Sequence, residues 1–363
     1  MFVRQIVLHN FRCFQQTSLS FARQASVLTG FNGAGKTSLL EALHYACYLK
    51  SFRTHSPYEL IKDESDSFFI RVSLDGADLY PHDIQVGVSG KKRMVKVDQK
   101  AVSSYKELLE YYRVITLTED DLALIKDGPE MRRSYLDQAI TLEQPDYLPK
   151  LKKLKTCIDN RNILLKQGRL TGDMFDLWTQ QLWQVSGEIR QERKAFLAEL
   201  GAKVSELVAH HFPAEVAIEF TYLTRKEKEV ATYEEFYAHH GSLWDDERML
   251  KRSLVGAHLD DFSITYAQRK SRVYASRGQQ KLIVVLCKIA QLIILAQKHS
   301  IKPLFLLDDF MTDFDPSRAK TLLNLLKGLE CQYIFTTPDD GTQLIELWGE
   351  GIQRLTFLSE KSA

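Results

Sequence analysis

The sequence predicts an α/β fold with a mixed sheet that is split, in the middle of the chain, by a short helical-hairpin lobe. Three observations predict it: short apolar strands near both ends, a glycine-rich segment between a strand and a helix, and a long helical pattern between these regions. We expect an N-terminal part of the head at 1–140, a helical insertion at 141–244 and a C-terminal part of the head at 245–363.

The composition is that of an ordinary globular protein. Of 363 residues, 44% are hydrophobic and 26% charged, which excludes collagen-like, low-complexity and disordered classes. Lys and Arg total 48 against 47 Asp and Glu, so any basic surface must be local. Five scattered cysteines without a C-x-x-C pair predict reduced thiols. The N-terminus lacks a signal-peptide pattern, and Lys288 and Gln291 interrupt the longest apolar stretch, so we expect a cytoplasmic protein with no membrane partner.

The N-terminal region reads as short strands around one helix. Strands are predicted at 2–8, 19–21, 25–29, 68–74, 84–88 and 94–97, and a helix from Thr37 to about Leu49. The last two strands are separated by S-G-K-K at 89–92, which is a hairpin signal. An antiparallel sheet is therefore expected beside the strand–glycine–helix unit.

The middle of the chain has a helical pattern. Between 148 and 212 only the segment 168–172 has turn chemistry. Apolar residues recur at steps of three, four and seven from Trp178 to Leu207, which draws one stripe along a long helix. Two such helices joined by a short loop form an antiparallel hairpin, and a strand at 216–222 follows. The stripe is interpreted as the core of this hairpin.

The C-terminal region returns to α/β character. Strands are predicted at 262–266, 303–307 and 332–336, and a long apolar helix follows the turn at Gly278. The second of these strands is continuously apolar, which is typical of a strand buried on both faces.

A glycine-rich loop after the strand at 25–29 fits the pattern G-x-x-x-x-G-K-[ST] at every fixed place. The loop consists of Gly30, Phe31, Asn32, Gly33, Ala34, Gly35, Lys36 and Thr37, followed by Ser38. Such a loop turns successive backbone N–H groups towards phosphate oxygens at a helix N-terminus. The lysine supplies a positive charge for the β- and γ-phosphates, and the threonine offers a hydroxyl to Mg²⁺. A plain helix-capping turn would explain the glycines but not the lysine followed by threonine.

Two consecutive carboxylates follow the buried strand at 303–307. Asp308 is placed to hold Mg²⁺ beside the phosphate loop, and Asp309 to orient or deprotonate an attacking water. Two acids exposed at a strand end are the plain alternative, and the phosphate loop favours the functional interpretation. A further segment, S-R-G-Q-Q at 276–280, brings a hydroxyl, a glycine and an amide to a helix N-terminus. Its spacing alone is weak evidence, because many helices begin with serine and glycine.

Together, the three elements resemble the Walker A, signature and Walker B motifs of an ABC-type ATPase, and in detail the RecF family, which is related to the SMC ATPases. Further blocks are similar to that family, namely N-F-R at 10–12, S-F-R-T at 51–54, R-R-S-Y-L-D at 132–137, G-A-H-L-D-D at 256–261 and A-S-R-G-Q-Q at 275–280. The resemblance implies an ABC/SMC-type ATPase head split by the helical lobe.

Several positions depart from the family pattern. Ser38 stands where asparagine is usual, and Ala257 and Leu259 replace proline and arginine. The strand at 332–336 is followed by Thr336 and Thr337 where transporter ATPases place a switch histidine, which argues against a transporter subunit.

The resemblance further implies a composite site with ATP and Mg²⁺ as cofactors. Lys36 would bind phosphate, Thr37 and Asp308 would hold the metal, and Asp309 would be the base. Ser276, Gly278 and Gln279 would contact nucleotide bound to a second copy, so that ATP drives formation of a homodimer. The family's function implies DNA at single-strand gaps and junctions as a partner, joint action with RecO and RecR in loading recombinase, and a slow, DNA-stimulated ATPase.

Other readings stay open at this point. Basic clusters at 91–93, at Lys150, Lys152, Lys153 and Lys155, and at Arg269, Lys270 and Arg272 could serve DNA, but singly each is typical of a solvated face. The histidine pairs at 210–211 and 239–240 are expected to be ordinary polar surface rather than metal ligands. Alternative functions are an ATPase that serves a membrane partner and an SMC-related nuclease. The nuclease would need a separate domain with metal-binding carboxylates, and no segment between the head motifs is expected to form one.

Overall fold

The structure is a computed structural model, and it describes residues 2–75, 80–168, 172–213, 215–224, 230–299 and 302–357. The chain forms two compact units. The first combines Met1–Leu122 with Val284–Ala363, and the second is Ala123–Ile283. The two ends of the chain therefore build one unit, as expected for a head that is split by an insertion.

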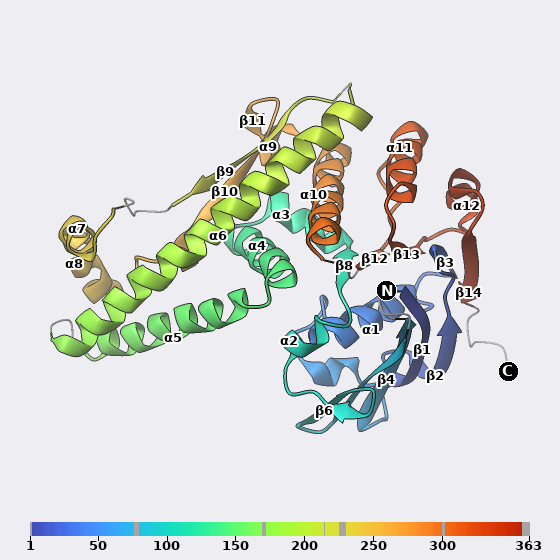
Figure 1. The fold of residues 1–363 in the computed structure, drawn as a ribbon, viewed down its shortest axis with the longest axis horizontal. Coiled ribbons are helices and arrows are strands. Elements are labelled where there is room, and N and C mark those ends of the chain that lie inside the picture. The colour runs from blue at the N-terminus through green and yellow to red at the C-terminus, as the bar shows by residue number, and fades with distance from the viewer. Residues whose placement is uncertain are drawn as a thin grey trace. The chain divides into compact units, whose positions relative to one another are not determined.

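An antiparallel sheet of six strands forms one part of the first unit (Figure 1). Its strand order is β2-β1-β4-β5-β6-β7. The strands are β1 (Phe2–Phe11), β2 (Phe14–Ser20), β4 (Ser67–Asp75), β5 (Pro81–Ser89), β6 (Lys92–Val97) and β7 (Lys100–Ala101). The predicted hairpin at 89–92 is present, because Ser89 at the end of β5 pairs with Lys92 at the start of β6.

A second sheet in the same unit has five strands, and all its pairings are parallel. Its order is β14-β3-β13-β12-β8. The strands are β3 (Ala25–Gly30), β8 (Val114–Leu117), β12 (Leu304–Leu307), β13 (Gln332–Thr336) and β14 (Ile352–Phe357). The carboxyl ends of β3, β13 and β12 therefore lie at one edge of the sheet. Helix α1 (Lys36–Tyr48) follows β3 and is buried along nearly its whole length against strands of both sheets.

Shorter helices complete the first unit. They are η1 (Pro57–Leu60), α2 (Tyr105–Leu108), η2 (Glu119–Leu122), α11 (Pro316–Lys327) and α12 (Thr342–Trp348). Helix α10 (Arg277–Lys298) begins in the second unit and ends in the first. It is long and apolar enough to cross a membrane, but 83% of its most apolar window is buried within the fold, as in the core helix of a soluble protein.

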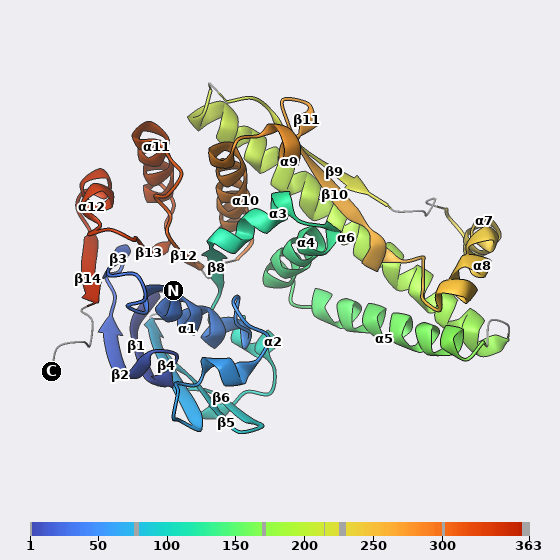
Figure 2. The same cartoon turned by 180° about the vertical axis from the view of Figure 1, so that it is seen from behind.

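The second unit is built on the predicted helical hairpin. Helices α5 (Tyr147–Lys166) and α6 (Asp173–His211) run side by side (Figures 1 and 2). The stripe on α6 is buried between Leu182 and Leu207, and Trp178 is half-buried. The other elements are α3 (Ala123–Lys126), α4 (Pro129–Glu143), α7 (Tyr233–His239), α8 (Gly241–Leu250), η3 (Ala257–Leu259), α9 (Ser271–Tyr274) and a sheet of β9 (Ile218–Leu223), β10 (Asp261–Tyr266) and β11 (Arg269–Lys270).

The boundaries of the units differ from those expected at 140 and 244. The structure draws them after Leu122 and after Ile283, because α4 packs on α6 and on β10, and β10 pairs with β9. These elements bury their apolar faces against the hairpin. One expectation about histidines is also wrong, since His240 is buried and its ring packs on Phe236 with centroids 4.4 Å apart.

Candidate active site

The glycine-rich loop connects β3 to α1 at the carboxyl edge of the parallel sheet. Its glycines have positive φ angles, +137° at Gly30, +85° at Gly33 and +96° at Gly35, which residues with a side chain rarely adopt. A Cβ atom at Gly35 would lie 2.7 Å from the Sγ atom of Cys13 and from the ring of Phe14. The loop therefore needs glycine at this position both for its backbone conformation and for the space.

Lys36 is the first residue of α1 and is 7% exposed. Its Nζ atom donates hydrogen bonds to the carbonyl oxygens of Gly30 at 2.7 Å and Phe31 at 3.0 Å. The ammonium group thus links the end of the loop to its beginning. Anionic phosphate oxygens are stronger hydrogen-bond acceptors than these neutral carbonyls. Within the loop, the residues from Phe31 to Gly33 are exposed.

Thr37 and Asp308 meet at the same edge, although they come from α1 and from the end of β12. The Thr37 hydroxyl lies 3.0 and 3.1 Å from the two carboxylate oxygens of Asp308. Burial raises the pKa of Asp308, hydrogen bonds from Thr336 and Thr37 oppose this rise, and the charge of Asp309 adds to it. A cation bound beside Asp308 would stabilise the ionised form of this carboxylate.

The next carboxylate, Asp309, has a left-handed backbone with φ +44°. Its N–H donates to the hydroxyl of Thr336 at 2.8 Å. That hydroxyl donates in turn to Oδ1 of Asp308 at 2.6 Å, and it lies 3.4 Å from Oδ1 of Asp309. The sequence indicated Thr336 only as a position where transporter ATPases have a histidine. Its contact with the two carboxylates follows from the register of β12 against β13, which the sequence alone does not give.

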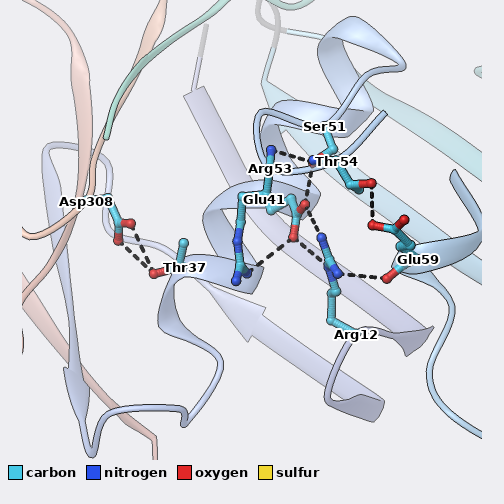
Figure 3. A network of polar contacts seen from close by, with 8 residues as sticks. All are labelled: Arg12, Thr37, Glu41, Ser51, Arg53, Thr54, Glu59 and Asp308. Carbon is cyan, nitrogen blue, oxygen red and sulfur yellow. Dashed lines mark hydrogen bonds and ion pairs between the residues drawn. The ribbon is translucent and has the colours of Figure 1, made fainter. Parts of the chain in front are cut away.

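A buried carboxylate on α1 ties three segments of the first unit together. Glu41 is 0% exposed and accepts two hydrogen bonds from Arg12, at 2.8 Å from Nε and 2.7 Å from Nη2. It also accepts a short hydrogen bond from Ser51 and lies 3.7 Å from Arg53. Figure 3 shows Arg53 on the side of Glu41 towards Thr37 and Arg12 on the other side. The N-F-R and S-F-R-T blocks therefore meet at α1. The sequence did not indicate this structural role for them.

The segment 276–280 forms the N-terminus of α10 and lies in the second unit. The backbone N–H of Ser276 donates to Oε1 of Gln279 at 2.8 Å, and the N–H of Gln279 donates to the hydroxyl of Ser276 at 3.3 Å. This reciprocal capping fixes the start of the helix. Ser276 is exposed, and Gly278 and Gln279 are half-buried.

The R-R-S-Y-L-D and G-A-H-L-D-D blocks meet inside the second unit. Arg132 forms two hydrogen bonds to Asp261, at 2.7 and 3.0 Å, and Arg133 donates to the carbonyl of Asp260 at 2.7 Å. Arg193 of α6 holds Asp137 with two bonds of 2.8 Å, and Arg190 holds the buried Asp260. These blocks thus fasten α4 and β10 to the hairpin.

The oxygen donors at the edge of the parallel sheet suit Mg²⁺. A hydroxyl and a partly buried carboxylate lie within 3.1 Å of each other, and Mg²⁺ prefers a few such ligands together with waters and phosphate oxygens. Within the described residues no group of three or more His, Cys, Asp and Glu side chains is arranged to hold a metal.

The three basic clusters are largely at the surface. Lys91, Lys92 and Arg93 are exposed at the β5–β6 hairpin, and Arg269, Lys270 and Arg272 at the β10–β11 hairpin and α9. On α5, Lys150 pairs with Glu192, and the exposed lysines are Lys152, Lys153 and Lys155.

Known proteins resemble the chain along most of its length. Residues 2–345 match the family described as RecF/RecN/SMC N terminal domain. The DNA replication and repair protein RecF of Myxococcus xanthus is 32% identical over 348 residues, which cover 92% of this chain and 89% of that protein. The RecF protein of Clostridium acetobutylicum is 30% identical over 332 residues, 91% of each chain.

Solved structures agree with these matches. The structure of the recombination mediator protein RecF-ATPrS in the RecFOR pathway has a TM-score of 0.84 and 26% identity, and the match covers 98% of this chain and 96% of that one. The Smc head domain of Pyrococcus furiosus, with a TM-score of 0.54 and 13% identity, shares the fold.

The fold and the site therefore define an ABC-type ATPase head of the RecF and SMC class, in which an α/β unit with a parallel sheet carries the phosphate loop. The chain belongs to the RecF family of DNA replication and repair proteins. The family and the fold class predicted from the sequence are thus confirmed.

Proposed function

We propose that the protein binds ATP with Mg²⁺ at the phosphate loop and uses ATP hydrolysis as a switch for binding DNA. The observation that carries this proposal is the meeting of Lys36, Thr37 and Asp308 at one edge of the parallel sheet. In a chain of the RecF family, this arrangement is the one that a nucleoside triphosphate requires.

The phosphates would lie in the loop from Gly30 to Thr37, with Ser38 beside them at the start of α1. The backbone N–H groups at the helix N-terminus favour negative charge. The ammonium of Lys36 would exchange its two carbonyl partners for the β- and γ-phosphates. Thr37 and Asp308 would hold the metal, and Mg²⁺ supplies positive charge against the phosphates when it is bound.

Asp309 is the group that we assign to the attacking water. Its carboxylate would orient the water and take its proton while the water oxygen forms a bond to the γ-phosphorus. The bond from that phosphorus to the bridging oxygen breaks, and ADP leaves with the electron pair. The resemblance to the RecF family implies that this turnover is slow.

A second copy of the chain would complete the site. Ser276, Gly278 and Gln279 lie at the N-terminus of α10, where the hydroxyl and backbone N–H groups suit an anion. We assign them to the γ-phosphate of ATP that is bound to the partner copy, so that ATP joins two heads and hydrolysis releases them.

The nucleic acid that we propose is DNA at single-strand gaps and junctions, in the cytoplasm. Support comes from the RecF relatives, which are DNA replication and repair proteins, and from a similar structure described as a recombination mediator of the RecFOR pathway. On this proposal the protein acts with RecO and RecR in loading recombinase, and DNA stimulates its ATPase. The exposed basic clusters, such as Lys152, Lys153 and Lys155, are candidate contacts to phosphates.

Light scattering after size-exclusion chromatography tests the nucleotide part of this proposal. The wild-type protein should form dimers with ATP and Mg²⁺ and remain monomeric with ADP. Lys36→Ala should stay monomeric with ATP, because the loop loses its only side-chain cation for the phosphates. Lys50→Ala, which removes an exposed lysine just after α1, is the matched control and should dimerise like the wild type. Dimers that persist in Lys36→Ala would refute the proposal.

A further inference from the structure

Thr336 lies between the two carboxylates that follow β12. Leu307 pairs with Phe335 in the parallel register of β12 and β13, so the next residues, Asp308 and Thr336, are neighbours across these strands. Thr336 is the last residue of β13 and is 0% exposed. A buried hydroxyl at this edge must have its hydrogen bonds satisfied within the protein.

The hydroxyl has one proton to donate and two lone pairs to accept. The proton goes to Oδ1 of Asp308 at 2.6 Å, and the 3.4 Å distance to Oδ1 of Asp309 is the longer alternative. A lone pair accepts the N–H of Asp309 at 2.8 Å. One side chain therefore holds the carboxylate of Asp308 and the backbone of Asp309 at the same time.

The backbone of Asp309 needs such a restraint. Its φ of +44° is in the left-handed region, which residues other than glycine adopt uncommonly, although aspartate does so more readily than most. The direction of the Asp309 side chain depends on this backbone conformation. Loss of the bond from its N–H to Thr336 would let the backbone relax and turn the carboxylate elsewhere.

We infer that Thr336 is a positioning residue, whose hydroxyl fixes the Asp308 carboxylate and the left-handed backbone of Asp309 in the arrangement needed for ATP hydrolysis. The inference rests on the proposed ATPase function and deepens it. The Thr336 hydroxyl donates to Asp308, whereas the ammonium of Lys36 donates to the carbonyls of Gly30 and Phe31, so Thr336 should affect hydrolysis more than nucleotide binding.

Three variants test this inference. Thr336→Val keeps the shape of the side chain and removes the hydroxyl, whereas Thr336→Ser keeps the hydroxyl. Thr337→Val is the matched control, because Thr337 is equally buried but donates to Asp339 at 2.5 Å and not to the carboxylates after β12. If Thr336→Val fails to fold, Thr336→Ala replaces it.

Steady-state ATP hydrolysis and binding of a fluorescent ATP analogue without Mg²⁺ are measured for each variant. Thr336→Val should lower kcat by about tenfold or more, because a small misplacement of reacting groups is costly. Its affinity for the analogue should change by less than about twofold, since the loop and helix N-terminus are intact. Thr336→Ser and Thr337→Val should keep kcat within about threefold of the wild type.

Equal kcat values for Thr336→Val and the wild type would overturn the inference, as would a Thr336→Ser variant that is as slow as Thr336→Val. A loss of analogue affinity in proportion to kcat would also overturn it, because it would indicate general distortion of the site. If the wild-type protein binds the analogue but hydrolyses no ATP, the proposed function itself fails and the inference falls with it.

Discussion

The hydroxyl of Thr37 lies 3.0 Å from a carboxylate oxygen of Asp308, although the two residues are 271 positions apart in the chain. The sheet order explains how they meet. Thr37 follows β3 and Asp308 follows β12, and β13 lies between these strands in the sheet. Because all three strands are parallel, their carboxyl ends bring Thr37, Thr336 and Asp308 to one edge. The site is therefore a product of the strand order and not of any local segment.

Asp309→Asn should trap the ATP-bound dimer. The amide keeps the size of the side chain but cannot take the proton of the attacking water, so hydrolysis stops while ATP still binds. Light scattering measures how long the dimer persists after excess ADP is added. A variant dimer that dissociates at the wild-type rate would remove Asp309 from this role.

Glu41→Ala should destabilise the first unit. It leaves the half-buried guanidinium of Arg12 without its carboxylate and also removes the acceptor of Ser51. Since Arg12 and Arg53 are partly exposed, we expect a loss of about 2–3 kcal/mol in the free energy of unfolding, below the full cost for a buried pair. Urea denaturation measures it. Glu110→Ala, at an exposed position after α2, is the control and should cost about 0.5 kcal/mol.

Glu247→Leu should destabilise the second unit through a buried ion pair. Arg161 and Glu247 are both 0% exposed and are joined by hydrogen bonds of 2.8 and 2.6 Å. Removal of the carboxylate leaves the buried charge of Arg161 unpaired, which should lower the free energy of unfolding by about 3–5 kcal/mol. The double variant Arg161→Met with Glu247→Leu should be more stable than Glu247→Leu alone, because no unpaired charge remains.

Tryptophan fluorescence can follow this unfolding, since Trp244 lies 5.3 Å from the Arg161 guanidinium. Glu206→Ala breaks an exposed pair with Lys203 on the same helix and should have no resolvable effect. A double variant that is less stable than Glu247→Leu would show that the pair does not act as one unit.

His44 should make the first unit less stable in acid. Burial lowers its pKa to about 3, and the positive charge of Lys288 acts in the same direction. The unfolded chain takes up this proton near pH 6.5, so the contribution of His44 is fully present above that pH and is lost as the pH falls towards 3. By pH 5 the loss is about 2 kcal/mol.

The measurement is the urea midpoint at pH 7 and pH 5 for the wild type and for His44→Gln, whose amide can still reach Thr116, the 2.8 Å partner of the imidazole. The decrease between the two pH values should be smaller in the variant. Equal decreases would show that His44 is not the group that titrates.

Local patterns sufficed to predict many elements of this protein. The glycine-rich loop, the apolar strand before Asp308 and the two arms of the hairpin each have a period or a motif within one segment. The strand β14 and the helices α7 and α8 were not predicted. Their sequences are short and mixed, and they are stabilised by contacts such as the pairing of β14 with β3.

Contacts between distant segments were beyond local reasoning. Nothing near Glu41 marks it as the acceptor for Arg12, and nothing near Arg161 marks Glu247 as its partner. The same holds for Thr336, whose importance depends on the register of β13 against β12. Pairing between strands and helices far apart in the chain determines these contacts, and a single sequence does not contain that pairing in any one segment.

On the proposed function, ATP controls DNA binding by this protein. The most direct test of this proposal is fluorescence anisotropy with gapped and fully duplex DNA at one stated salt concentration, with ATP, ADP or no nucleotide. We predict tighter binding with ATP, a preference for the gapped DNA, and loss of the ATP effect in Lys36→Ala. Absence of DNA binding in every nucleotide state, together with intact ATP-driven dimerisation, would contradict the claim and indicate a different partner for this ATPase.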